Sequence, residues 1–369
     1  MNTAVEGPPL VTAPRERGWR WLILALVGAM TVSFVSQWPP SLSLIAVLVR
    51  WLLPVESFGV LLLAGISACA LASWTRGGKL LPAVLAAVFL VWLVWRGPAD
   101  TGAVGAFSHG WTLLVTAGFG WLCMMSGARS LFVRALSAIV LAGAMTVLLA
   151  SWRDRAPGEA LSRLSLSFHR ALDERRDESL GVWRDRVSSE AWSALANRVP
   201  GVARTAEQTV VWVEASPPPT VVVPSLLVLE SLAALALAWS LWHRLVRVRL
   251  GPPLATLSAF RFNDQFVWGL VAGATLVLLP SLSAWRTFGM NLLVVFGALY
   301  ALRGIAVLLW WLPDRFAIVP LLLLLVCIPL LGPVLVLATV AVLALGLGLG
   351  DTWRDFRRSA RPLRPDARP

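Results

Sequence analysis

The chain has 369 residues, of which 57% are hydrophobic and only 14% are charged, and its mean hydropathy is +0.74. Soluble domains carry about 25% charged residues, so this composition excludes an ordinary soluble protein. The net charge of +12 is spread over short segments with no basic patch or binding motif, which argues against a nucleic-acid partner. The chain has 20 tryptophans, many of them at the ends of apolar runs, as in the aromatic belt of membrane proteins.

The first 151 residues predict a tail followed by a membrane bundle of about five spans. Residues 1–20 are expected to form a polar cytoplasmic tail that contains prolines and ends in several arginines. The apolar run 21–37 lacks a small-x-small cleavage site, which predicts a retained first helix rather than a signal peptide. Residues 41–53 are too few for a span of about 20 residues and predict a re-entrant or interfacial helix. Further spans are expected at 57–74, 80–95, 109–125 and 135–151.

Residues 152–220 predict a water-soluble helical insert, because they carry ten Arg and ten Asp or Glu. Leu164, Phe168 and Leu172 follow one another at helical spacing, as in an amphipathic helix. Gly181 and the Pro200-Gly201 pair are predicted helix breaks. The balanced charge argues against attraction to anionic lipid. The insert is predicted to be a solvated hairpin, a partner-binding hairpin, a lid over an external opening or a helix on the membrane surface.

Residues 221–350 predict a second membrane bundle of about five spans, followed by a basic cytoplasmic tail at 351–369. Residues 316–350 are too many for one span, and the Gly332-Pro333 pair among them predicts a tight hairpin of two short helices. The remaining spans are expected at 221–242, 266–284 and 288–312. The predicted fold is therefore an all-α polytopic transmembrane bundle of about ten spans with a helical extracytoplasmic insert.

The distribution of charge predicts the orientation. Ten spans place both termini on one side of the membrane. If that side is the cytoplasm, its segments hold 18 Arg or Lys and 7 Asp or Glu, whereas the opposite side holds 13 and 12. This asymmetry follows the positive-inside rule and predicts a multi-pass protein of the bacterial inner membrane with cytoplasmic termini.

Two ionisable residues, Glu230 and Arg303, lie well inside predicted spans. An arginine at that depth costs at least about 2.5–3.5 kcal/mol on insertion scales, so it needs a partner or a function. Together with Asn291, the pair is the candidate substrate-binding site, lining a polar cavity. The alternatives are a structural ion pair between helices or an arginine that reaches the interface. Asn291, Gly297 and Gly304 are also candidates for close packing against a neighbouring helix.

The other motifs give no support for catalysis. Gly348-Leu349-Gly350-Asp351 matches the GxGD string of intramembrane aspartyl proteases, but no other span contains the second carboxylate that this chemistry needs. A glycine-rich helix end explains it better. Cys69, Cys123 and Cys327 have no metal-ligand spacing and are expected to be packing residues. We therefore expect a protein that is not an enzyme and has neither a metal site nor a cofactor.

The second half resembles the YybS-like family of predicted bacterial membrane proteins, domain of unknown function 2232. The similarity rests on PSLLVLESLAALALAW, on FRFNDQFVWGL at 260–270, on NLLVVFGALYALRGIAVL at 291–308 and on GDTWRDFRR at 350–358. The resemblance implies a multi-pass inner-membrane protein without an established activity. It also implies a fold distantly similar to the substrate-binding membrane subunits of energy-coupling-factor vitamin transporters.

Two functions follow as hypotheses. The first is a transporter-like protein that binds a small solute in a membrane cavity near Glu230, Asn291 and Arg303. The alternative is a membrane scaffold whose insert and basic tail recruit envelope or cytoplasmic protein partners. The first hypothesis predicts a polar cavity at the midplane, and the second predicts a filled core. An intramembrane enzyme is the least favoured reading.

Overall fold

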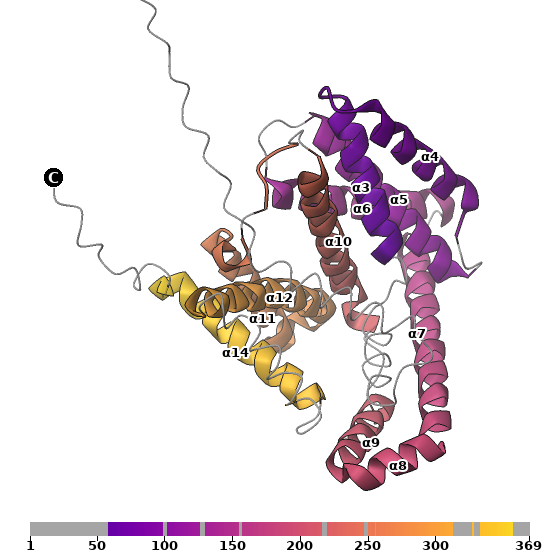
Figure 1. Ribbon diagram of the computed structural model, residues 1–369, viewed down its shortest axis with the longest axis vertical. Coiled ribbons are helices and arrows are strands. Elements are labelled where there is room, and N and C mark those ends of the chain that lie inside the picture. Colours follow the sequence, from indigo (N-terminus) through magenta and orange to yellow (C-terminus); the bar gives the residue numbers. More distant parts are fainter. Residues whose placement is uncertain are drawn as a thin grey trace, which may run out of the picture.

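The fold is helical throughout the part of the chain that the structure describes. The computed structural model describes residues 58–98, 102–125, 130–154, 157–215, 220–246, 250–254, 256–312, 327 and 333–356. These residues form helices joined by loops and 3₁₀ turns, with no β-strand among them (Figure 1). The predicted all-α class is confirmed. The predicted helices at 21–37 and 41–53, both distal tails and nearly all of 313–332 lie outside the described residues.

A first group of helices packs around α3 (Phe58–Trp74). α3 contacts α4 (Leu80–Arg96), α5 (Ala103–Met125) and α10 (Val223–Leu245). α6 (Leu131–Asp154) packs against α5 and α10. All five helices overlap spans expected from the sequence.

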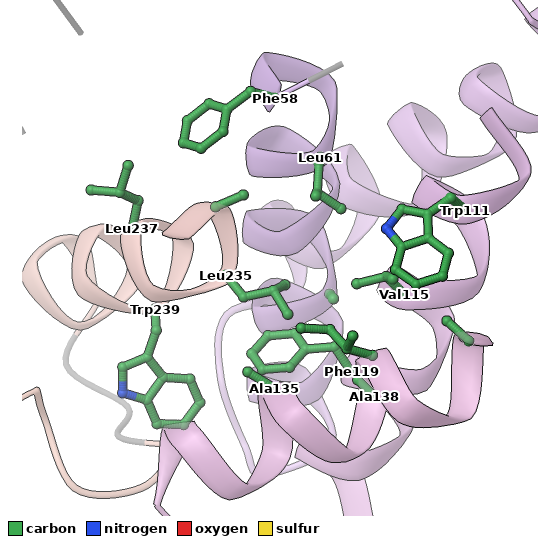
Figure 2. Packing of buried hydrophobic residues seen from close by; sticks show 14 of the residues in the cluster. Phe58, Leu61, Trp111, Val115, Phe119, Ala135, Ala138, Leu235, Leu237 and Trp239 are labelled. Carbon is green, nitrogen blue, oxygen red and sulfur yellow. The ribbon is translucent and has the colours of Figure 1, made fainter. Parts of the chain in front are cut away.

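The core of this group is built from side chains of α3, α5, α6 and α10 (Figure 2). Phe119 and Trp239 meet edge to face, with ring centres 6.3 Å apart, and both are fully buried. The Trp111 indole N–H donates a hydrogen bond to the Ser231 hydroxyl at 3.0 Å, so the one polar atom of that side chain is satisfied. Because these contacts join α5 to α10, the second half of the chain is fixed to the first.

Residues 157–215 form an arm of three helices, α7 (Pro157–Val187), α8 (Glu190–Arg198) and α9 (Pro200–Ala215). In Figure 1, α7 extends away from the bundle and carries α8 and α9 at its far end. The predicted break at Gly181 is wrong, since α7 continues to Val187. Leu180 and Trp183 are both buried on either side of that glycine, and their burial offsets its roughly 1 kcal/mol helix penalty. The predicted break at Pro200 is confirmed, because that proline begins α9.

A second group contains α11 (Val267–Leu278), α12 (Arg286–Trp311) and α14 (Pro333–Arg354). α12 is its centre, packing against both α11 and α14. The single span predicted at 266–284 is interrupted, because α11 ends at Leu278 and a 3₁₀ turn follows over Pro280–Trp285. Pro280 lacks a backbone N–H and disfavours a helical conformation at Leu279, which explains the interruption.

Several described segments are suited to a membrane. Three are both long and apolar enough to cross it, namely Leu131–Leu149, Thr220–Arg244 and Pro280–Trp311. Three apolar helices are shorter, namely Phe58–Trp74, Leu80–Arg96 and Asp264–Leu278. A 17-residue helix such as α3 is about 25 Å long, somewhat less than the roughly 30 Å of the hydrocarbon layer.

Candidate functional site

Arg303 is the centre of a buried ionic cluster between α12, α14 and the turn before α11. Its side chain is 1% exposed, and all three of its nitrogen atoms are hydrogen-bonded. Nε donates to the Asp351 carboxylate at 2.9 Å, and Nη2 donates to the Asp351 carbonyl at 3.1 Å. Nη1 donates to the Asp264 carboxylate at 2.6 Å. The cost of placing an arginine in this helix is therefore offset by two carboxylates.

Two glycines allow α14 to come close enough for this contact. A side chain on Gly304 would collide with the carbonyl group of Ala344, and one on Gly348 would collide with the carbonyl of Tyr300. The backbones of α12 and α14 therefore touch directly, as in membrane helix pairs with small residues at their interface. Arg303 directly precedes Gly304 on α12, and Asp351 lies about one turn after Gly348 on α14. The crossing at the two glycines therefore places the Arg303 guanidinium beside the Asp351 carboxylate. The close approach expected at Gly304 is confirmed. A Cβ atom added at Gly297 would meet no atom of the described residues within 4 Å.

The turn that carries Asp264 is held by further contacts. The guanidinium carbon of Arg303 lies 5.5 Å from the centre of the Phe262 ring, and that ring meets Tyr300 edge to face at 4.9 Å. Arg261 forms an ion pair with Asp355 at 2.8 Å. These contacts tie the segment before α11 to the end of α14.

Asp351 therefore does more than end a glycine-rich helix. Its side chain is fully buried, and it shares Arg303 with Asp264. The two carboxylates of an aspartyl-protease site share one proton, whereas here a guanidinium bonds to both. The GxGD resemblance is thus explained by helix packing at Gly348 and by ion pairing at Asp351.

Asn291 lies at the opposite end of α12 and fastens it to the beginning of α10. Its side-chain oxygen accepts a hydrogen bond from the Ser225 backbone N–H at 2.9 Å, and its side-chain nitrogen donates to the Val221 carbonyl at 2.7 Å. These contacts confirm the expected role of Asn291 in packing between helices. Both the oxygen and the nitrogen of the side-chain amide are therefore hydrogen-bonded.

Glu230, the third predicted site residue, is 7% exposed on α10. The ion pairs of Arg303 are made with Asp264 and Asp351, so the structure gives Arg303 partners other than Glu230. The hydrogen bonds of Asn291 are made with residues at the beginning of α10 and within α12. The assignment of Glu230, Asn291 and Arg303 to substrate binding stays a prediction.

An apolar cavity of about 340 Å³ lies between the two groups of helices. Its walls come from α6, α10 and α12 and from the loop that follows α10. It is lined by Leu131, Phe132, Ala135, Leu229, Leu232, Ala233, Ala236, Leu237, Ser240, Leu254, Phe260, Ala298, Leu299 and Leu302. The only polar side chain among these is that of Ser240. Leu229 and Leu302 adjoin Glu230 and Arg303 in the chain, but the two charged residues do not line the cavity.

Two further arginines hold the loop after α10. Arg76 donates to the Leu250 and Cys123 carbonyls, each at 2.7 Å, and the buried Arg134 donates to the same Leu250 carbonyl at 3.1 Å. The Trp239 indole N–H donates to the Pro252 carbonyl at 3.2 Å. The sequence analysis counted these two arginines only as loop charges that help to predict the orientation. Nothing in the sequence near them indicates a bond to the Leu250 carbonyl, more than 100 residues away.

No metal site emerges from the described residues, where no three His, Cys, Asp or Glu side chains are placed to bind one ion. Cys69 and Cys123 are free thiols, and both are buried. The site is thus a pair of unlike features, an ionic cluster at Arg303 and an apolar cavity beside it.

The apolar helices, their packing and the internal ionic cluster define a class, that of polytopic α-helical membrane proteins. Residues 217–348 match the model of a family described as "Predicted membrane protein (DUF2232)", in agreement with the resemblance found for the second half. The match covers about a third of the chain and runs from just before α10 into α14. It includes the cavity walls from α10 and α12. Comparisons with curated proteins and with solved structures found no match.

Proposed function

We propose that the protein is a transporter-like, non-enzymatic membrane protein that binds a small apolar molecule in the cavity between α6, α10 and α12. The observation that carries the proposal is the cavity itself. Its volume of about 340 Å³ lies at the lower end of the range of small-molecule sites, about 300–1,000 Å³.

The lining indicates the class of solute. Aliphatic and aromatic side chains make up the walls, with the Ser240 hydroxyl as the one polar side-chain group. Such a lining favours a hydrocarbon-like solute or the apolar part of an amphipathic one, since a charged solute would lose its hydration without compensation. The solute proposed from the structure is therefore less polar than the sequence suggested. Bilayer lipid is the natural reservoir for it.

The predicted site residues have a supporting role in this proposal. Asn291 fixes α12 near its beginning and Arg303 fixes it in its second half, and α12 supplies Ala298, Leu299 and Leu302 to the cavity. Glu230 follows Leu229, another lining residue. Their substitution is expected to act on the cavity through the position of the helices.

The experiment is a thermal-unfolding screen of the purified protein against fatty acids, isoprenoid alcohols and fat-soluble vitamins, with nucleosides and amino acids as polar comparisons. A compound that binds only the folded state raises its apparent stability, by about 2.7 kcal/mol at a concentration of 100 Kd. We expect stabilisation by apolar compounds alone. Stabilisation by the polar compounds alone would contradict the proposal.

A variant that fills the cavity supplies the control. Ala298→Phe places a ring into the cavity from α12 and is expected to abolish the stabilisation by apolar compounds. Ala272→Phe adds the same ring at an exposed position of α11 and is expected to leave it unchanged. An equal response in both variants would show that the compounds bind elsewhere.

The arm supports a second candidate, a scaffold that recruits protein partners. Trp183, Trp192 and Ala203 give the arm a small core of its own, and Val182, Val199 and Val211 remain exposed on it. A scaffold role predicts that deleting residues 157–215 removes a partner while ligand-induced stabilisation persists. Solute binding alone predicts that no partner is lost.

A further inference from the structure

We propose that the segment Thr256–Phe266 is a gate over the apolar cavity, latched shut by Arg303. The inference rests on the proposed function, because it concerns the regulation of the same cavity. Three walls of the cavity are helices, whereas the fourth is the loop between α10 and α11, which contributes Leu254 and Phe260. Lids over binding sites are drawn from such loops, since these move at lower cost than packed helices.

The beginning of the loop is fixed and serves as the anchor. Arg76 and Arg134 both bond to the Leu250 carbonyl, and Trp239 bonds to the Pro252 carbonyl. The guanidinium carbon of Arg134 also lies 5.2 Å from the centre of the Trp239 ring. Three side chains from α6, α10 and the turn after α3 therefore hold residues 250–252 in place.

The far end of the loop is held by charged side chains. Asp264 bonds to Arg303, and Arg261 pairs with Asp355 beyond the end of α14. The side chains of Asp264 and Arg261 are 59% and 46% exposed, so water competes for both ion pairs. These two ion pairs form the latch. Because Phe260 lies next to Arg261 and lines the cavity, the latch helps to fix the position of the Phe260 ring in the cavity wall.

The bonds between Arg303 and Asp351 make an open state of the gate accessible. When Asp264 leaves, Arg303 keeps its two bonds to Asp351, so its buried charge remains paired. Opening therefore leaves no isolated charge in the bundle.

The test measures access to the cavity by labelling a cysteine placed at Ser240. Native Cys69, Cys123 and Cys327 are replaced by alanine, and the full chain in nanodiscs is exposed to a hydrophilic maleimide in the absence of any solute. Asp264→Asn is expected to raise the labelling rate of the cysteine by up to about fivefold, because the latch is weakened. An unchanged rate would overturn the gate.

Charge reversal at the exposed pair distinguishes the latch from damage to the fold. Arg261→Asp alone is expected to speed labelling, and the double variant Arg261→Asp with Asp355→Arg is expected to restore the slow rate. Equal rates in the single and double variants would contradict the latch. Since no solute is present, either negative result leaves the solute-binding proposal standing, which is tested by the unfolding screen.

Discussion

At the scale of single residues, Arg303 shows how a membrane helix accommodates a charge. Both of its carboxylate partners are distant in sequence, 39 residues away at Asp264 and 48 residues away at Asp351. The need for a partner could be predicted, because an arginine inside a span is costly. Its identity could not, since it depends on the crossing of α12 with α14 and on the turn before α11.

The two partners are expected to contribute unequally to stability. Arg303→Gln leaves the fully buried Asp351 without its cation and is expected to cost about 3–5 kcal/mol, as is typical when one member of a buried pair is removed. Asp264→Asn breaks a pair whose carboxylate is largely exposed and is expected to cost about 1 kcal/mol or less. Thermal unfolding in detergent measures both changes.

A double variant tests the cause of that loss. Arg303→Gln together with Asp351→Asn removes the unpaired charge and is expected to recover part of the stability lost in Arg303→Gln alone. Equal stability of the single and double variants would show that the ion pair is not the reason for the loss.

Asn291 provides a test at the other end of α12. Asn291→Leu keeps the size of the side chain but removes its bonds to the Ser225 N–H and the Val221 carbonyl. We expect a loss of about 1–2 kcal/mol from the two hydrogen bonds between elements, at about 0.6–1 kcal/mol each. A third bond, to the Thr287 carbonyl within α12, disappears as well. Thr275→Val on the exposed side of α11 removes only a bond within its own helix and is the control, expected to lie within 0.5 kcal/mol, roughly, of the native protein.

At the scale of elements, the apolar runs predicted the helices well, because hydrophobic length is a property of local sequence. The predicted and observed helices differ where a glycine or a proline competes with the pattern of apolar residues. Gly181 was expected to end a helix, but buried neighbours carry α7 through it. Pro280 divides a run whose hydropathy alone suggested one continuous span.

Glycines within one helix provide a matched test of the α12–α14 crossing. Gly304→Ala would place a methyl group against the Ala344 carbonyl and is expected to lower the unfolding temperature strongly. Gly297→Ala on the same helix meets no atom within 4 Å and is expected to be neutral or to stabilise by about 0.5–1 kcal/mol. Gly348→Ala and Gly346→Ala repeat the comparison on α14. Similar effects within each pair would contradict the direct backbone contact.

At the scale of the whole molecule, contacts bring several loops together at one end. Arg76, Cys123 and Leu250 meet at one end, and the rings of Phe132 and Phe266 extend this end toward Asp264, their centres 6.0 Å apart. Several loops that the distribution of charged residues predicts to be cytoplasmic therefore lie together. The cavity between the two groups of helices could not be predicted, because it depends on how the groups pack.

The orientation itself is open to a direct test. A cysteine at Ser165 in the arm is expected to react with an impermeant maleimide added to intact cells, whereas one at Lys79 is expected to react only after the cells are opened. Both replace exposed residues in a background without native cysteines. The reverse pattern would place the arm in the cytoplasm and the basic loops outside.

The most direct test of solute binding is to measure what the protein carries when it is purified. Mass spectrometry of organic extracts would compare the native protein with Ala298→Phe, at equal protein amounts and after exhaustive washing in the same detergent. The account predicts one class of apolar molecule, near one per chain in the native protein and depleted in the filled-cavity variant. Equal amounts in the two, or none in the native protein even after incubation with bacterial lipid extract, would contradict a solute site between α6, α10 and α12.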